Sequence, residues 1–432
     1  MSAISTHPET ASPSSAPHSR RDTTRLVLAA SIGNALEWFD LTAYGYFAVQ
    51  ISKEFFPSGS DAVSLLLAFG TFGVSYLVRP VGAIVLGAYA DKAGRKASLL
   101  VSIMLMMIGT FIMAFWPNYN TIGLAAPIGI LCARLMQGFS VGGEFGSSTA
   151  FLVEHDASRK GFLSSFQFSS QGVSNLLGSL FGLILSVSLA ASDLQAWGWR
   201  TPFLFGLLIG PVGLYIRRRI DETPEFVETK VTRAPVKELF ASHKFDLLLA
   251  IGAVTLSTAT NYLIVYMPTY ALKSLGLPQS IGFLAAVVAA LVLTFVAPLT
   301  GHWSDKVGRT SIMFVVAVAA LFTILPTFMF LNGHPTAAVM IAALAWIAII
   351  KAGYAGALPA LMAEIFPTQI RGTGMSLAYN IAVTIFGGFS PLINSSLIQL
   401  TGSNLSPAFY IMMIALLSLV TLVILRRRGA AS

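Results

Sequence analysis

The stretch Gly87-Ala88-Tyr89-Ala90-Asp91-Lys92-Ala93-Gly94-Arg95 decides the fold, because five of its positions recur later in the chain. The repeated residues are found at a constant offset of 214 positions in Gly301-His302-Trp303-Ser304-Asp305-Lys306-Val307-Gly308-Arg309. Both copies are short polar segments between long apolar runs. Repetition at a fixed period indicates a duplicated structural unit. We therefore predict a chain of two similar halves.

The composition predicts that these halves lie in a membrane. Of the 432 residues, 55% are hydrophobic and only 11% are charged, and the mean hydropathy is +0.74. A soluble domain is typically about 25% charged, so a soluble enzyme and a disordered scaffold are excluded. A membrane-spanning helix needs about 20 mostly apolar residues. Such runs occur near 26–49, 62–89, 97–115, 121–145, 161–189, 200–219, 245–270, 281–301, 311–331, 336–362, 372–398 and 405–425.

The basic residues predict the orientation and the domain boundaries. With both termini in the cytoplasm, 21 of the 27 Lys and Arg residues fall on the cytoplasmic side and only three outside, as the positive-inside rule requires. The expected fold is an all-α membrane protein with twelve transmembrane helices in two pseudo-symmetric six-helix halves. We expect a disordered cytoplasmic tail at 1–24, the first half at 25–219, a cytoplasmic linker at 220–244, the second half at 245–426 and a short tail at 427–432.

Several motifs resemble those of a known family. The repeated loop is similar to the signature loop of the major facilitator superfamily, and Arg134-Leu135-Met136-Gln137-Gly138 resembles its fourth-helix motif. Resemblance to the metabolite:proton symporters, which carry citrate, α-ketoglutarate, shikimate, proline or betaine, is closer still. It is carried by Gly33-Asn34-Ala35-Leu36-Glu37-Trp38-Phe39-Asp40, Trp199-Arg200-Thr201-Pro202-Phe203, Glu222-Thr223-Pro224-Glu225-Phe226 and Glu364-Ile365-Phe366-Pro367. The segment from Gly387 to Gly402 is most similar to citrate-proton symporters, and the resemblance implies a transporter that works by alternating access.

Ionisable residues inside the expected spans are the candidate transport residues, because a charge at mid-membrane is costly and usually faces a cavity or a partner. Asp40 and Glu37 share a face of the first span, and Arg134 lies at a similar depth on the fourth. An ion pair between Asp40 and Arg134 can therefore be a proton switch or a permanent structural salt bridge. Related sugar carriers use such a pair for proton coupling, so the resemblance implies the switch. We expect Asp40 or Glu37 to carry the proton. Lys351 has no acid nearby and either pairs with another helix or, as we expect, binds a substrate carboxylate.

Polar stripes on other spans complete the expected substrate site. Gln167 and Gln171 lie on the fifth span, Tyr262 on the seventh and Asn380 on the eleventh. Such stripes either hold helices together or line a water-filled pathway. We expect that these residues line the pathway. The expected substrate-binding residues are thus Arg134, Lys351, Gln167, Gln171, Asn380 and Tyr262.

The duplicated loop is either a topology marker or a cytoplasmic gate. The resemblance implies the gate, in which the acidic and basic residues pair across helix ends to hold one state of the transport cycle. A looser second repeat adds one glutamate to each half. The expected gate residues are Asp91, Arg95, Asp305, Arg309, Glu154 and Glu364.

One segment matches an enzyme motif in sequence but not in structural context. Gly138-Phe139-Ser140-Val141-Gly142 matches the nucleophile elbow of hydrolases, but that motif follows a β-strand. Here it lies in an expected membrane helix, and Gly138, Gly142 and Gly146 are spaced four residues apart. Small residues at this spacing favour close helix packing, which is what we expect.

These features predict a proton-coupled symporter that imports an organic anion, a di- or tricarboxylate such as citrate. Moving one negative charge inward against 100 mV costs about 2.3 kcal/mol, so a multivalent anion needs protons to enter. The alternatives are a proton symporter of proline or betaine and one of shikimate or α-ketoglutarate. We expect protons and membrane lipid as partners, and a monomer in the inner membrane of a bacterium. No cofactor, metal, nucleic-acid partner or enzymatic activity is expected.

Overall fold

The computed structural model describes residues 31, 34–35, 37–93, 95–142, 144–156, 158–218 and 235–428, and no strand occurs within them. The first half is helical at 37–46 and continues through α2 (Ala48–Phe55), α3 (Asp61–Leu77), α4 (Arg79–Ala93), α5 (Arg95–Phe115), α6 (Tyr119–Ile122), α7 (Ala125–Val141), α8 (Glu144–His155), α9 (Lys160–Ser188), α10 (Ala191–Ala196), η1 (Gly198–Arg200) and α11 (Thr201–Arg218). The second half contains α13 (Pro235–Ser242), α14 (Lys244–Lys273), α15 (Gln279–Val307), α16 (Arg309–Gly333), α17 (Ala337–Ala355), α18 (Leu358–Ile365), α19 (Arg371–Ala382), the π-helical η2 (Val383–Gly388), α20 (Ser390–Thr401) and α21 (Ser406–Arg427).

Within the described residues, each of the twelve predicted spans coincides with helical structure. Among the described residues, eight stretches of helix are long and apolar enough to cross a membrane, beginning with Asp61–Leu86 and ending with Ser406–Arg427. The other four predicted spans coincide with the helix at 37–46 and α2, with α5, with α7 and α8, and with α11. Within the predicted linker, the described residues form the short helix α13.

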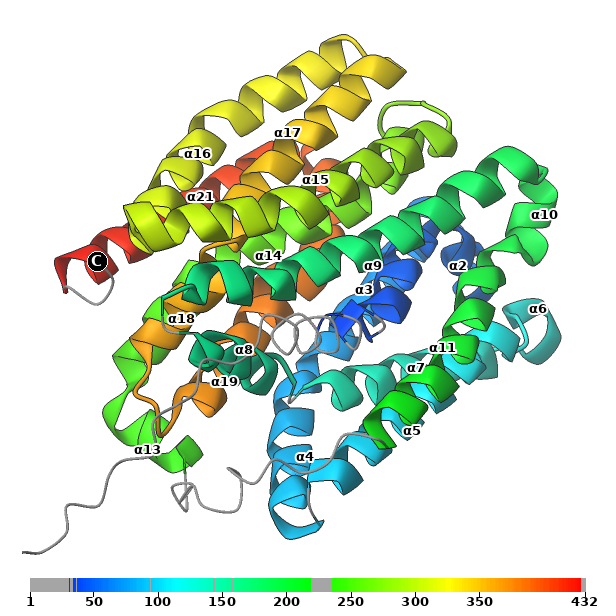
Figure 1. The fold of residues 1–432 in the computed structure, drawn as a ribbon. Helices are drawn as coiled ribbons and strands as arrows, with labels where there is room; N and C mark the ends of the chain where they lie inside the picture. The colour runs from blue at the N-terminus through cyan, green and yellow to red at the C-terminus, as the bar shows by residue number, and fades with distance from the viewer. Residues whose placement is uncertain are drawn as a thin grey trace, which may run out of the picture.

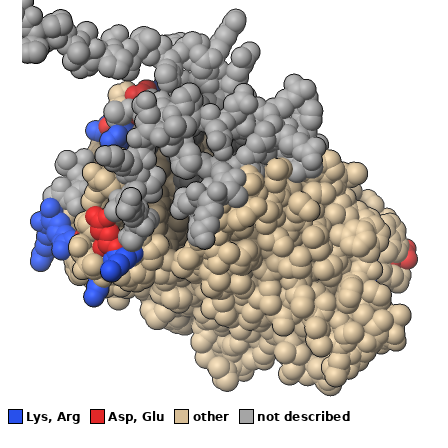
Figure 2. Space-filling model, turned by 90° about the horizontal axis from the view of Figure 1, so that it is seen from below, with Lys and Arg blue, Asp and Glu red and all other residues tan. Residues whose placement is uncertain are grey.

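The outer surface of the bundle is apolar, as contact with lipid requires. Large hydrophobic side chains such as Leu208, Phe295, Phe322 and Leu400 remain exposed on different helices. In Figure 2 a broad face carries almost no charge, and the visible Lys, Arg, Asp and Glu residues gather mainly at one end. This arrangement agrees with a chain that crosses the membrane several times.

Glycines allow α7 to lie very close to α3 and α4. A Cβ atom on Gly138 would collide with the main-chain oxygen of Ser75, and one on Gly142 would collide with that of Arg79. On α8, Gly146 faces the α19 backbone in the same way. The close helix packing predicted from the glycine spacing is confirmed.

The two halves meet along a polar interface. Figure 1 shows α9 of the first half lying along α15 of the second, and α8 also packs against α19. The helices at this interface carry buried polar side chains such as Gln171, Asn261 and Asn380. Because lipid cannot satisfy these groups, they face the interior, where the candidate site lies.

Candidate functional site

Asp40 is buried inside the first half. Thr110 of α5 donates a hydrogen bond to its Oδ2 atom, while Oδ1 has no hydrogen-bond partner in the described structure. A Cβ atom on Gly206 of α11 would collide with Oδ1, so this glycine leaves room for the carboxyl group. The carboxyl group of Asp40 thus lies between α5 and α11, with Oδ2 hydrogen-bonded and Oδ1 without a hydrogen-bond partner among the described residues.

Arg134 is connected to Asp40 through two other side chains. Its Nη1 atom donates to Gln137 Oε1 at 2.9 Å, and Gln137 Nε2 donates to Thr110 Oγ1 at 3.1 Å. Thr110 in turn donates to Asp40. An amide has both a donor and an acceptor and can therefore bridge two polar groups. The described structure contains this chain of hydrogen bonds in place of the direct Asp40–Arg134 ion pair considered from the sequence.

Aromatic rings hold the Arg134 guanidinium in place. Its central carbon lies 4.5 Å from the ring centroid of Tyr44 and 5.3 Å from that of Phe72. The side chain is fully buried, and its Nη2 atom also approaches Ser75 Oγ at 3.4 Å. Cation–π contacts stabilise a desolvated arginine by about 2 kcal/mol, so the rings help to keep the charge in the interior.

Lys351 has partners that the sequence did not suggest. Its Nζ atom donates to the main-chain oxygen of Ser257 at 2.9 Å and to Ser257 Oγ at 2.8 Å. It also lies 4.4 Å from the ring centroid of Phe168 on α9. The lysine therefore lies at the interface between the halves, and in the described structure it contacts a serine and a ring rather than an acid.

The two glutamines of α9 have different surroundings. Gln167 Nε2 donates to Asn34 Oδ1 at 3.0 Å, and Asn34 Nδ2 donates to the main-chain oxygen of Gln167 at 3.0 Å. This reciprocal pair connects α9 to the first span. Gln171 is also buried, but its Oε1 atom has no hydrogen-bond partner among the described residues.

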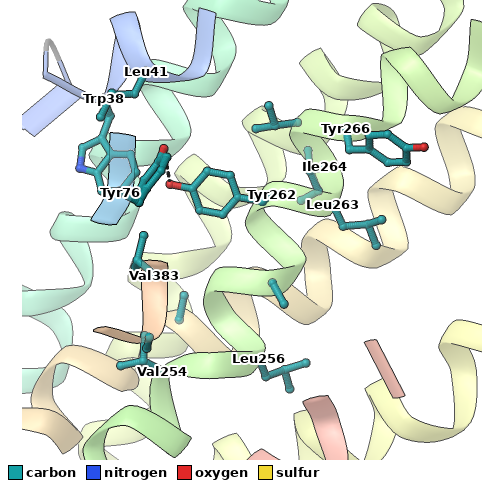
Figure 3. Packing of buried hydrophobic residues seen from close by; sticks show 14 of the residues in the cluster. Trp38, Leu41, Tyr76, Val254, Leu256, Tyr262, Leu263, Ile264, Tyr266 and Val383 are labelled. Carbon is teal, nitrogen blue, oxygen red and sulfur yellow. Dashed lines mark hydrogen bonds between the residues drawn. The ribbon is translucent and has the colours of Figure 1, made fainter. Parts of the chain in front are cut away.

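Asn380 and Tyr262 both connect the two halves. Asn380 Nδ2 donates to the main-chain oxygen of Gly142 at 2.7 Å. The hydroxyl of Tyr262 donates to that of Tyr76 at 2.7 Å, as Figure 3 shows. Figure 3 also shows Trp38 beside Tyr76, so aromatic side chains from both halves meet here. Both predicted residues lie at the interface, where a change in the arrangement of the halves would break their bonds.

A small pocket lies at this interface and includes Glu37. It also includes Arg79, whose guanidinium carbon lies 3.9 Å from the ring centroid of Tyr76 and 5.0 Å from that of Trp38. Arg134 and Lys351 are not part of the pocket wall. The wall is formed by Asn34, Glu37, Trp38, Arg79, Val141, Phe145, Tyr379 and Asn380.

At the end of the bundle that holds the second copy of the loop, Asp305 connects the halves. Its carboxylate accepts hydrogen bonds from the main-chain nitrogens of Gly161 at 2.7 Å and Phe162 at 3.0 Å, at the start of α9. A helix N-terminus favours such a negative charge. Arg309 contacts Asp305 at 3.2 Å and Glu364 at 2.8 Å.

The glycine that recurs in both copies of the loop has a conformational role in the second copy. Gly308 has a φ angle of +93° between α15 and α16, a conformation that glycine adopts without strain. The two ion pairs of Arg309 bring together three of the expected gate residues, Asp305, Arg309 and Glu364. The side chains of the other three, Asp91, Arg95 and Glu154, lie outside the described part of the structure.

Sequence reasoning missed three residues of this region. Gln137 was part of the fourth-helix motif but received no role, and Thr110 gave no signal in the sequence. Arg79 received no role from the sequence, whereas the structure buries it completely, with its guanidinium over the rings of Tyr76 and Trp38. An arginine within an apolar run was the signal that could have identified it.

Comparison with known proteins agrees with this architecture. A model of the Major Facilitator Superfamily matches residues 30–391. The chain is 39% identical to the citrate-proton symporter of Klebsiella pneumoniae, over 94% of this chain and 92% of that protein. It is 33% identical to the proline/betaine transporter of Salmonella typhimurium, over 92% of this chain and 82% of that protein.

A solved structure shares the fold. The crystal structure of a D-xylose-proton symporter superposes with a TM-score of 0.73 at 20% identity, covering 93% of this chain and 97% of that one. The predicted fold of twelve membrane helices in two halves is confirmed. Since the family model and the relatives cover most of its length, the chain belongs to the major facilitator superfamily of multi-pass membrane transporters.

Proposed function

We propose that the protein is a proton symporter that imports an organic anion, a di- or tricarboxylate such as citrate, by alternating access. The observation that carries the proposal is the buried hydrogen-bonded chain from Asp40 to Arg134. The 39% identity with a citrate-proton symporter supports the same assignment. The chain acts as a transporter and not as an enzyme.

Asp40 carries the proton in this proposal, and Glu37 assists. A neighbouring arginine stabilises a carboxylate, whereas moving the arginine away favours the protonated acid. Gln137 and Thr110 transmit a shift of Arg134 to Asp40 because they join the two groups. The uncommitted Oδ1 atom of Asp40 is then the position that receives the proton.

The anion occupies the polar interface between the halves. Arg134 and Lys351 make this region positive, and the buried amides and the tyrosine hydroxyl select the shape of the substrate. A multivalent anion moves inward against the membrane potential at a cost of about 2.3 kcal/mol per charge and 100 mV. Protons that enter with it offset this cost. The residues that shape the site are Gln167, Gln171, Asn380 and Tyr262.

The gate and the orientation follow from the charges at the helix ends. Asp305, Arg309 and Glu364 hold the cytoplasmic ends of the halves together in one state, and Asp91, Arg95 and Glu154 form the corresponding group in the first half. The bias of basic residues supports a bacterial inner-membrane protein with both termini in the cytoplasm. We assign it as a monomer surrounded by lipid.

Uptake into proteoliposomes tests the function. The purified protein is reconstituted, an inward proton gradient is imposed, and the uptake of labelled citrate, α-ketoglutarate, shikimate and betaine is measured in parallel. We expect uptake of a carboxylate that a protonophore abolishes. Accumulation of betaine alone would support the osmolyte alternative. Uptake of a carboxylate that does not depend on the proton gradient would contradict the role of Asp40.

A further inference from the structure

Arg79 is the buried cation of this interior whose charge is least satisfied by the protein. Its side chain is completely buried at the start of α4. The Nε and Nη2 atoms have no hydrogen-bond acceptor within the described residues. The rings of Tyr76 and Trp38 stabilise the charge, but a ring face accepts no hydrogen bond comparable to that of a carboxylate. Burying charged donors without acceptors is strongly unfavourable, so this edge of the guanidinium is suited to an anion, although Glu37 lies in the same pocket wall.

The positions of the two free donors indicate which anion. Nε and Nη2 lie on the same edge of the planar guanidinium, with their hydrogens parallel. This edge matches the two oxygens of a carboxylate, and such two-pronged pairs are shorter and about twice as strong as neutral hydrogen bonds. A carboxylate is therefore the group that this edge of Arg79 fits.

The other two cations are already engaged. Arg134 donates to Gln137 and Ser75 through its two Nη atoms, and only its Nε atom has no partner among the described residues. The Lys351 ammonium donates twice to Ser257. Neither lines the pocket, whereas Arg79 does. Of the three fully buried cations in the described part of the chain, Arg79 thus combines an unused bidentate edge with a place in the pocket wall.

Two stacked rings close this pocket between the halves. Phe145 of α8 lies on Tyr379 of α19 with 3.5 Å between the ring centroids and 4° between the planes. Both rings belong to the pocket wall. Because one ring comes from each half, separation of the halves also separates the rings and opens the way to Arg79.

We propose that Arg79 is a substrate-binding residue, whose Nε–Nη2 edge holds one carboxylate of the transported anion. The inference rests on the proposed function, because it assumes that the substrate is a carboxylate. It adds a ligand from α4 that sequence reasoning did not assign. Asn380 lies in the same wall, so a carboxylate on Arg79 is within the region where the halves meet.

Calorimetric titration of citrate into the detergent-solubilised protein tests the inference without any transport step. Arg79→Gln removes the charge, and Arg79→Lys keeps a charge but loses the two-pronged geometry. We expect affinity for citrate to fall about 10- to 100-fold in Arg79→Gln and by a smaller factor in Arg79→Lys. The matched control is Arg159→Gln, because Arg159 also lies over a ring, that of Phe162, but is exposed.

The outcomes separate this inference from the function on which it rests. Wild-type affinity for citrate in both Arg79 variants would overturn the role of Arg79 and leave the symporter assignment intact. If the wild-type protein binds betaine and none of the anions citrate, α-ketoglutarate and shikimate, the proposed function fails, and this inference about the transported anion fails with it. Thermal unfolding of the ligand-free variants shows whether they are folded; if Arg79→Gln is not, the affinity of Arg79→Lys decides.

Discussion

Gln137 is the residue whose replacement tests the proposed proton coupling most directly. Its amide joins Arg134 to Thr110, which contacts Asp40. Gln137→Met keeps a similar volume and removes both hydrogen bonds. A hydrogen bond to a charged group contributes about 1.5–3 kcal/mol, and 1.4 kcal/mol corresponds to a factor of ten. We expect proton-driven uptake to fall about 10- to 150-fold.

The assay compares two activities of the same proteoliposomes. Proton-driven uptake requires the link to Asp40, whereas exchange of labelled for unlabelled substrate at equal pH does not require net proton movement. Exchange should therefore change much less than proton-driven uptake in Gln137→Met. Ser75→Ala is the matched control, since it removes the 3.4 Å contact of Arg134 without touching Thr110 or Asp40. Wild-type proton-driven uptake in Gln137→Met, or an equal loss of both activities, would refute the reasoning.

Three further predictions concern the gate and the packing. Asp305→Asn weakens the contact of this side chain with the α9 N-terminus. The distribution of distances between spin labels on the α9 N-terminus and the α15 C-terminus should therefore broaden and extend to longer values. An unchanged distribution would count against the role of Asp305 in the gate. Gly138→Ala forces the α7 and α3 backbones apart at a cost of about 1–3 kcal/mol and should lower the melting temperature in detergent, whereas Gly70→Ala, with open space around it, should not. Arg200 donates to two main-chain oxygens at the end of α5, at 2.9 and 3.0 Å. Arg200→Gln should therefore lower the melting temperature and leave the affinity for citrate unchanged. A loss of citrate affinity together with the lower melting temperature would contradict a purely structural role.

The sequence by itself determined the membrane location, the two halves and the twelve helices. These follow from composition and from repeats, which depend on local residue type and spacing. The membrane helix α16 could be predicted from the sequence alone, because an apolar run of this length has few alternatives to a membrane helix. The glycine spacing at Gly138 and Gly142 likewise predicted close packing, because a glycine leaves the same space wherever a neighbouring helix approaches.

Only the tertiary structure decided how the interior charges are partnered. Depth along a span placed Asp40 and Arg134 at the same level, but their connection through Gln137 depends on how the helices are rotated about their axes. Lys351 gave no indication in sequence that Ser257 would satisfy it. Arg79 likewise became a candidate only once its packing was known. Hydrogen bonds between distant segments require side chains to meet within about 3 Å, and residue spacing along one helix does not fix the position of another.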